Sequence, residues 1–257
     1  TFLSVMFLAC CFNGSLCAQS DAQIYERTCD AKTYPFSDPS PVATPNNSYY
    51  PYFRFDGFSM QAQEKQWKMV VLENDYVKLT VTPEIGGKIW GAIDKVNNKE
   101  FVYTNGVVKF RDVAMRGPWT SGGIEFNFGI IGHAPTCSTP IDYLTKKNVD
   151  GSVSCHIFSY EWITRTVWNV EINLPKDKAY FTTHTTWFNQ SSIDQPYYQW
   201  MNAGYATKTG TRFYYPGTYS IGHSGDLHPY PIDEEGRDVS WYDNNNFGAS
   251  KSLHIIG

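Results

Sequence analysis

The sequence predicts an all-β protein, built as a large antiparallel β-sandwich. Apolar and polar residues alternate with the period of a strand, and turn residues recur roughly every 10 to 15 positions. Aromatic side chains make up 16% of the 257 residues and charged ones only 18%, a balance typical of strands rather than of surface helices. No convincing helical period separates the predicted strands, so an antiparallel sandwich explains the pattern best.

The predicted strands follow one another with short connections from residue 69 onward. In the second of them, Val77, Leu79 and Val81 alternate with polar residues, and the turn before it contains Asn74 and Asp75. Such a pattern is typical of a hairpin with one buried face. The predicted strands cover residues 69–72, 76–83, 88–94, 100–103, 124–130, 152–162, 163–174, 180–189 and 197–205.

One predicted strand carries both structural and chemical signals. Ile124 and Phe126 fall on one face of it, and Glu125 and Asn127 on the other. A carboxylate and an amide about 7 Å apart on one face, with Trp119 just before them, provide hydrogen-bonding groups and an aromatic wall. This combination suits a sugar ligand. The alternative is an ordinary strand whose polar side faces water.

The chain is expected to have three parts. Residues 1–18 are uncharged and apolar and end near Ala18, which predicts a signal peptide truncated at its start, with a lipoprotein cysteine at position 10, 11 or 17 as an alternative. Residues 19–65 form an extended lead-in segment rich in proline. Residues 66–257 form the sandwich domain, which we expect to be incomplete at its C-terminus. The protein is therefore expected to be secreted, periplasmic or in the cell envelope.

Charge and cysteine usage limit the partners. The net charge of −4 and the lack of clustered Lys and Arg argue against nucleic acid, and the leader is too short for an integral membrane span. Cys29, Cys137 and Cys155 remain after the leader. A disulfide between Cys137 and Cys155 is possible, but the pairing stays open.

We expect neither a metal nor a cofactor. His223, Asp226 and His228 lie within six residues of one another and could ligate a metal, but their spacing matches no recognised site.

Residues 72–90, followed by Gly122-Gly-Ile-Glu-Phe-Asn-Phe128, resemble the galactose-mutarotase-like superfamily. Within it, the chain is similar to an uncharacterised bacterial domain that often stands ahead of tetratricopeptide repeats in longer secreted or envelope proteins. The resemblance covers about residues 65–257. It implies a large antiparallel supersandwich whose concave sheet holds a carbohydrate, and possible protein partners through C-terminal repeats.

The resemblance also bears on the chemistry. Aldose epimerases use a His and a Glu as acid and base, and their catalytic His stands in a His-Pro-Tyr-like context. The matching region here reads Trp200-Met-Asn-Ala-Gly204, with Asn202 nearest to that position. Because an amide cannot shuttle the proton, aldose 1-epimerase activity is less expected than glycoside hydrolysis. Arg237 and Asp238 resemble another family motif.

The candidate site combines these residues. Glu125 and His133 are the catalytic candidates, and Arg116 with Trp119 could clamp a sugar by hydrogen bonding and stacking. Each has a structural alternative: a solvent-facing Glu, a loop His, or a turn with a buried Trp; for His184 it is a satisfied sheet histidine. The substrate-binding candidates are Arg116, Trp119, Asn127, His184, Asn202, Arg237, Asp238 and Trp241.

Three functions remain open at this point. The first is a glycoside hydrolase or related sugar-processing enzyme, which needs a second carboxylate about 5 to 10 Å from Glu125. The second is a carbohydrate-binding domain without catalysis, for which the same surface suffices. The third is a scaffold domain of a longer envelope protein.

Overall fold

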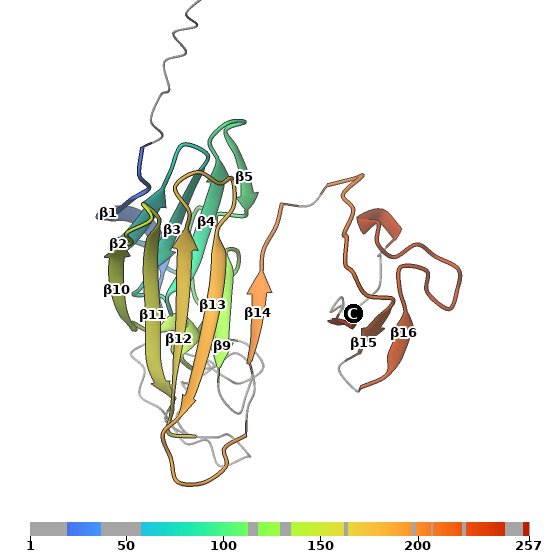
Figure 1. Ribbon diagram of the computed structural model, residues 1–257. Helices are drawn as coiled ribbons and strands as arrows, with labels where there is room; N and C mark the ends of the chain where they lie inside the picture. The colour runs from blue at the N-terminus through green and yellow to red at the C-terminus, as the bar shows by residue number, and fades with distance from the viewer. Residues whose placement is uncertain are drawn as a thin grey trace, which may run out of the picture. The chain divides into compact units, whose positions relative to one another are not determined.

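The computed structural model describes residues 20–36, 58–112, 118–128, 135–161, 164–196, 199–206, 208–222, 225–244 and 254–256. The chain divides into two compact units, Thr1–Gly204 and Tyr205–Gly257, which Figure 1 shows in ribbon form. The fold class is all-β, as predicted, because strands and two short 3-10 turns account for the regular structure of the described ranges. Within these ranges no helix is long and apolar enough to cross a membrane.

The first unit is built on two sheets. The larger runs in the order β14-β9-β4-β3-β2-β1-β6, with β5 paired to β4, and the smaller in the order β10-β11-β12-β13. A short β7-β8 pair accompanies them. The strands are β1 (Gln23–Tyr34), β2 (Gln63–Glu73), β3 (Val77–Thr82), β4 (Lys88–Asp94), β5 (Lys99–Val102), β6 (Val108–Lys109), β7 (Arg111–Asp112), β8 (Pro118–Trp119), β9 (Ile124–Phe128), β10 (Asp142–Lys147), β11 (Val153–Glu161), β12 (Thr166–Leu174), β13 (Thr182–Asn189) and β14 (Gln199–Ala203).

The main core lies between the two sheets. Its buried residues come mainly from one face of β2, β3, β4, β9, β11 and β12, which is why apolar residues alternate along β3, β9 and β12. Phe128 of β9 stacks on Trp168 of β12 with ring centroids 4.4 Å apart. Ile124 and Phe126 lie in the same core, so the predicted inward face of this strand is confirmed.

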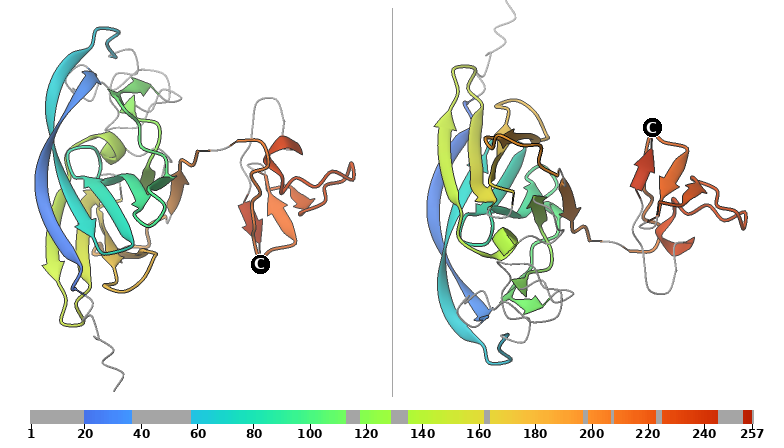
Figure 2. Two further views of the ribbon diagram at one scale, coloured as in Figure 1. Left: turned by 90° about the horizontal axis from the view of Figure 1, so that it is seen from above. Right: turned by 90° about the horizontal axis from the view of Figure 1, so that it is seen from below.

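The large sheet is strongly curved, and the inside of the curl is the face that points away from the main core. β5 pairs with β4, yet β6, which is separated from β5 by five residues, pairs in parallel with β1 at the far end of the sheet. This is possible only if β1 bends back toward β4, and Figure 2 shows the curvature of β1 and β2. The curled face encloses a second core made of Trp67, Met69, Ile85, Trp90, Val108 and Phe110.

The segment expected at residues 19–65 as an extended lead-in contains a long strand of the larger sheet. Gln23–Tyr34 forms the 12-residue strand β1, which pairs along its length with β2. Its pattern is hard to recognise because few of its residues are buried. The prolines that indicated irregular structure begin at Pro35 and so follow the strand. Likewise β2 begins at Gln63, six residues before the predicted start.

The second unit was not predicted as separate, since residues 66–257 were expected to form one domain. Its described part contains the sheet β16-β15-β17. The strands are short, β15 (Tyr219–Ile221), β16 (Leu227–Pro229) and β17 (His254–Ile256), because proline and glycine interrupt every longer period.

Three backbone segments meet at the Gly-Gly-Ile-Glu motif. The Gly123 amide donates to the Tyr103 carbonyl at 2.8 Å, and the Gly204 amide donates to the Gly123 carbonyl at 2.8 Å. Gly123 has φ +64°, and a Cβ there would lie less than 3.0 Å from the Ile89 carbonyl oxygen. The motif therefore needs glycine to bring β4, β9 and β14 together.

We expect Gly123→Ala to destabilise the first unit by at least about 3 kcal/mol, because both the positive φ and the close carbonyl oppose a side chain. Gly106→Ala is the matched control, since a Cβ there meets nothing within 4 Å. Urea unfolding followed by tryptophan fluorescence measures both. Equal midpoints for the two variants would contradict this account of the motif.

The three cysteines in the described ranges, Cys29, Cys137 and Cys155, are free thiols. Cys155 is completely buried in the main core on β11. Burial raises its pKa from 9.0 to about 12, so the folded protein holds the thiol proton where the unfolded chain has lost it. The corresponding stabilisation is complete below pH 9 and disappears as the pH rises toward 12.

Cys155→Ala should therefore flatten the alkaline loss of stability. Between pH 8 and pH 10.5 the unmodified protein is expected to lose about 2 kcal/mol of unfolding free energy through this thiol, and the variant to lose that much less. Ile157→Val, on the same strand and in the same core, is the control without a titrating group. Urea titrations across this pH range would contradict the idea if both variants kept the slope of the unmodified protein.

Candidate functional site

A β-bulge on β4 brings Trp90 to the curled face. In the β3–β4 pair Thr80 lies opposite Gly91 and Val81 opposite Ile89, so Trp90 is the extra residue. Bulges redirect side chains and sharpen the local twist. Here Trp90 and Gly91 both line a pocket on the curled face, whereas a regular strand would have turned one of them toward the main core.

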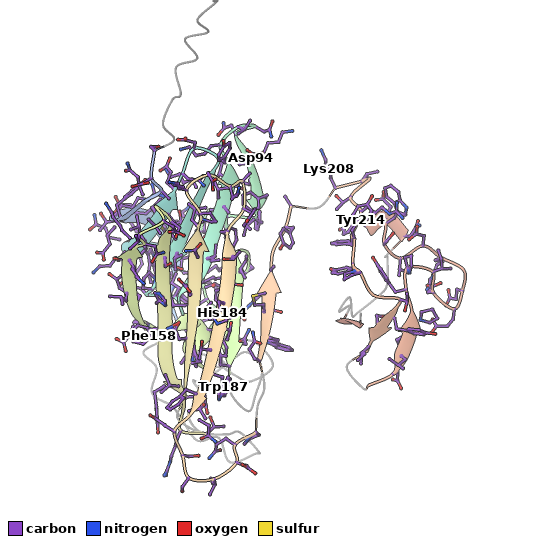
Figure 3. All side chains as sticks on the ribbon, viewed as in Figure 1. Asp94, Phe158, His184, Trp187, Lys208 and Tyr214 are labelled. Carbon is purple, nitrogen blue, oxygen red and sulfur yellow. The ribbon has the colours of Figure 1, made fainter. Side chains whose placement is uncertain are left out.

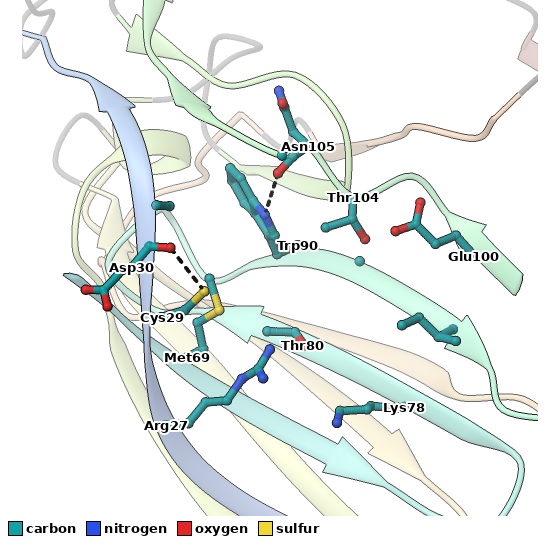
Figure 4. Close-up of a pocket in the computed structure, with 14 residues that line it drawn as sticks. Arg27, Cys29, Asp30, Met69, Lys78, Thr80, Trp90, Glu100, Thr104 and Asn105 are labelled. Carbon is teal, nitrogen blue, oxygen red and sulfur yellow. Dashed lines mark hydrogen bonds between the residues drawn. The ribbon is translucent and has the colours of Figure 1, made fainter. Parts of the chain in front are cut away.

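The pocket has a volume of about 270 Å³ and lies inside the curl. Its lining comes from β1, β2, β3, β4 and β5 and from the β5–β6 segment, residues 103–107. Figure 4 shows Trp90 above Met69 and Thr80, with Arg27 and Lys78 on the opposite side. The pocket thus combines an indole and a thioether with hydroxyl, amide and charged groups.

The β5–β6 segment forms one wall of the pocket. The Trp90 Nε1–H donates to the Asn105 carbonyl at 3.1 Å, and the Asn105 Nδ2–H donates to Ser121 Oγ at 2.9 Å. A Cβ at Gly91 would collide with the side chain of Thr104, so the absence of a side chain there allows the segment to lie close over β4. These contacts fix the indole ring.

A buried polar cluster lies on the same side of the sheet, at the β9 and β14 end. Glu125 is 1% exposed, and its Oε1 accepts hydrogen bonds from Asn127 Nδ2 at 2.8 Å and from Asn202 Nδ2 at 3.3 Å. Asn202 lies directly opposite Glu125 in the β14–β9 pair. The structure therefore brings together three of the predicted site residues.

Lys88 adds a buried positive charge to this cluster. It is 1% exposed, and its Nζ donates to the Thr120 carbonyl and to Thr120 Oγ1, the latter at 3.2 Å. The same atom lies 6.0 Å from the centre of a Trp119 ring. Burial lowers the pKa of Lys88, and the negative charge of Glu125 partly opposes that shift. The fourth predicted residue, Trp119, thus lies beside the cluster.

The buried thiol of Cys137 is also affected electrostatically by the cluster. Burial raises its pKa well above the ordinary range, and Glu125 raises it further. Glu125 and Asn127 are at most 1% exposed. The polar side of β9 therefore does not face water, contrary to the alternative that the sequence left open. In this geometry Glu125 orients two amides and balances a buried ammonium.

The remaining predicted residues lie elsewhere or outside the described ranges. Arg116, His133 and His223 fall outside the residues that the structure describes. His184 lies exposed on β13, in the smaller sheet and opposite Glu171; Figure 3 labels it on this strand. Among the described residues no group of three or more His, Cys, Asp or Glu could hold a metal ion.

Arg237, Asp238 and Trp241 belong to the second unit. The Arg237 guanidinium binds Asp233 with an Nε–Oδ2 distance of 2.7 Å, and Asp238 accepts from the Ser240 amide at 3.1 Å. The Trp241 ring lies 4.9 Å from the guanidinium of Arg212. These side chains stabilise turns of the second unit.

Several pocket residues were not predicted. Two of them, on β3, had a signal in the sequence, because they are polar positions that alternate with core residues. On β3 the alternation that predicts the core also points Lys78 and Thr80 to the other face. The missed residues are Arg27, Lys78, Thr80, Glu100, Thr104 and Asn105.

Residues 44–257 match the family model described as a domain of unknown function, DUF5107. The chain belongs to this family. A similar fold occurs in a TPR-domain-containing protein from Parabacteroides distasonis, with a TM-score of 0.74 and 24% identity. The match covers 86% of this chain and 38% of that protein, so the DUF5107 chain spans well under half of its structural neighbour. Neither match names a sugar-processing enzyme, and the galactose-mutarotase-like resemblance stays a prediction.

Glu125→Gln tests whether the cluster is a charge pair. The substitution keeps the shape but leaves Lys88 buried without its nearby negative charge, and we expect a loss of about 3 kcal/mol of unfolding free energy. Adding Lys88→Met should restore part of that loss, giving a coupling energy of about 1 to 3 kcal/mol in a double-mutant cycle. Additive effects in urea unfolding would show that the two charges act independently.

Proposed function

We propose that this DUF5107 chain is a carbohydrate-binding protein whose ligand occupies the pocket inside the curled sheet. The observation that carries the proposal is the bulged Trp90, held against Asn105 and surrounded by polar groups such as Thr80 and Thr104. An aromatic surface ringed by hydroxyl, amide and charged groups matches a sugar, which presents apolar ring faces and many hydroxyls.

The burial and the hydrogen bonds of Glu125 favour sugar binding over sugar hydrolysis. Glycosidic hydrolysis needs two carboxyl groups at the sugar, about 5 to 10 Å apart. Glu125 is 1% exposed, and its Oε1 already accepts two amide hydrogen bonds. A role in supporting the sheet beside the pocket fits this burial better than attack on a glycosidic bond.

The uncharged leader at residues 1–18 supports export to the cell surface, the periplasm or the medium, where glycans are available as ligands. A second candidate function is that of a scaffold domain that binds a protein partner. The match to a TPR-domain-containing protein is the observation that favours it.

The test is a glycan-array screen with the whole chain, followed by calorimetry on the strongest ligand. Thr80→Trp should fill the pocket and weaken binding by at least about tenfold, because the indole takes the space of the ligand. Thr186→Trp is the matched control, since Thr186 lies exposed on β13 in the other sheet. Circular dichroism verifies that both variants fold.

A folded protein that binds no glycan would contradict the carbohydrate proposal and leave the scaffold candidate. Equal affinity of Thr80→Trp and Thr186→Trp would place the ligand somewhere other than the pocket. Chromatography of the bound oligosaccharide after long incubation tests for cleavage, and shorter products would assign the protein to the hydrolases.

A further inference from the structure

The charges of the pocket are unevenly distributed, and Arg27 is the clearest sign of this. Arg27 lies on β1 opposite Met69 and lines the pocket. Among the described residues, its guanidinium forms no hydrogen bond or ion pair with another side chain. A guanidinium carries five N–H donors in a planar fork, so these donors are available to a ligand.

Lys78 adds a second positive charge that is only partly compensated. Its Nζ lies 3.6 Å from Glu73 Oε2. Glu73 is also bound by Lys95 at 2.8 Å and accepts a hydrogen bond from Tyr25 at 3.0 Å. Two lysines therefore share one carboxylate, and a net positive charge remains beside the pocket.

The carboxylates of the lining residues do not neutralise these cations. Figure 4 shows the Asp30 carboxylate pointing away from the pocket, to which Asp30 contributes its backbone side. Glu100 lies beside Thr104, across β4 from Lys78, because Lys78 pairs with Ile93 and Ile93 pairs with Glu100. Two strand spacings, about 9.6 Å, therefore separate the backbones of Lys78 and Glu100.

The pocket thus has a cationic side at Arg27 and Lys78 and an acceptor side at Glu100, with Trp90 between β3 and the β5–β6 segment. The whole chain has a net charge of −4, so the cationic side is a local feature rather than part of a general excess of positive charge. A ligand that fits has an anionic group at one end and hydroxyl donors at the other.

We propose that the pocket selects acidic saccharides, in which a uronic acid carboxylate binds Arg27 and Lys78. The planar carboxylate matches the guanidinium fork in a bidentate geometry. The sugar ring packs against Trp90, and its hydroxyls donate to Glu100. This inference rests on the proposed carbohydrate binding and specifies the chemical class of the ligand.

The experiment compares a matched pair of ligands, an oligogalacturonide and its methyl ester, which differ in charge and share the sugar skeleton. Calorimetry with the whole chain should give at least about tenfold tighter binding of the acid, and the difference should shrink as salt is added. Arg27→Met should bring the ratio of acid to ester affinity close to one, whatever it does to the affinity for the ester itself, and Arg27→Lys should keep part of the preference.

Lys32→Met is the matched control, since Lys32 is exposed on β1 and its odd sequence separation from Arg27 puts it on the opposite face. It removes the same charge from the same strand and should leave the preference intact. Thermal unfolding verifies that both variants fold.

The outcomes separate the two proposals. If acid and ester bind equally to the unmodified protein, the acidic-saccharide inference is wrong and carbohydrate binding stands. If the acid is preferred but Arg27→Met keeps the preference, the assignment to Arg27 is wrong. If neither ligand binds and the glycan array is also blank, the proposed function itself fails.

Discussion

The curl of the large sheet is the constraint on which the rest of the first unit depends. β4 is irregular on both sides, with a bulge at Trp90 against β3 and a register shift at Ala92 and Ile93 against β5. Extra residues bend and twist a strand, and the bend lets β6 reach β1. The second core, the pocket and the position of the β5–β6 segment all follow from this closure.

The polar cluster at Lys88 and Glu125 and the pocket at Arg27 lie on the same side of the sheet, but they differ in the free-energy cost of burying their charges. Lys88 and Glu125 are each 1% exposed, and buried charges are costly unless hydrogen bonds and an opposite charge compensate them. Asn127, Asn202 and Thr120 provide those hydrogen bonds. Arg27, in contrast, is exposed, so its guanidinium keeps water as a partner.

The sequence predicted what depends on local periodicity. Alternation along β9 identified both the core face, with Phe126 and Phe128, and the polar face, with Glu125 and Asn127. It could not predict Lys88 as a neighbour of Glu125, because the β4–β9 pair joins distant segments and alternation does not fix register. The bulge at Trp90 was hidden for another reason: β3 and β4 are close in sequence, but the alternation along β4 does not show where an extra residue interrupts the pairing.

β1 was missed for a different physical reason. One of its faces covers the curled side with Arg27, Cys29 and Ala31, and the other is largely exposed. A strand with so few large apolar residues has little periodic signal. Four of the predicted site residues, Trp119, Glu125, Asn127 and Asn202, are nevertheless close together. The pocket beside them was not predicted, since it draws on β1, β3, β4 and β5 at once.

The division between cluster and pocket has a consequence for specificity. Substitutions at exposed positions change stability by only a few tenths of a kcal/mol, whereas changes to buried charges cost several. Arg27 and Glu100 are exposed, while Lys88 and Glu125 are buried. The strand positions on β1 and β5 that line the pocket can therefore vary without disturbing the polar cluster that supports the sheet. The charges that line the pocket thus belong to exposed side chains, whereas the buried charges beside it belong to the hydrogen-bonded cluster that joins β9 and β14.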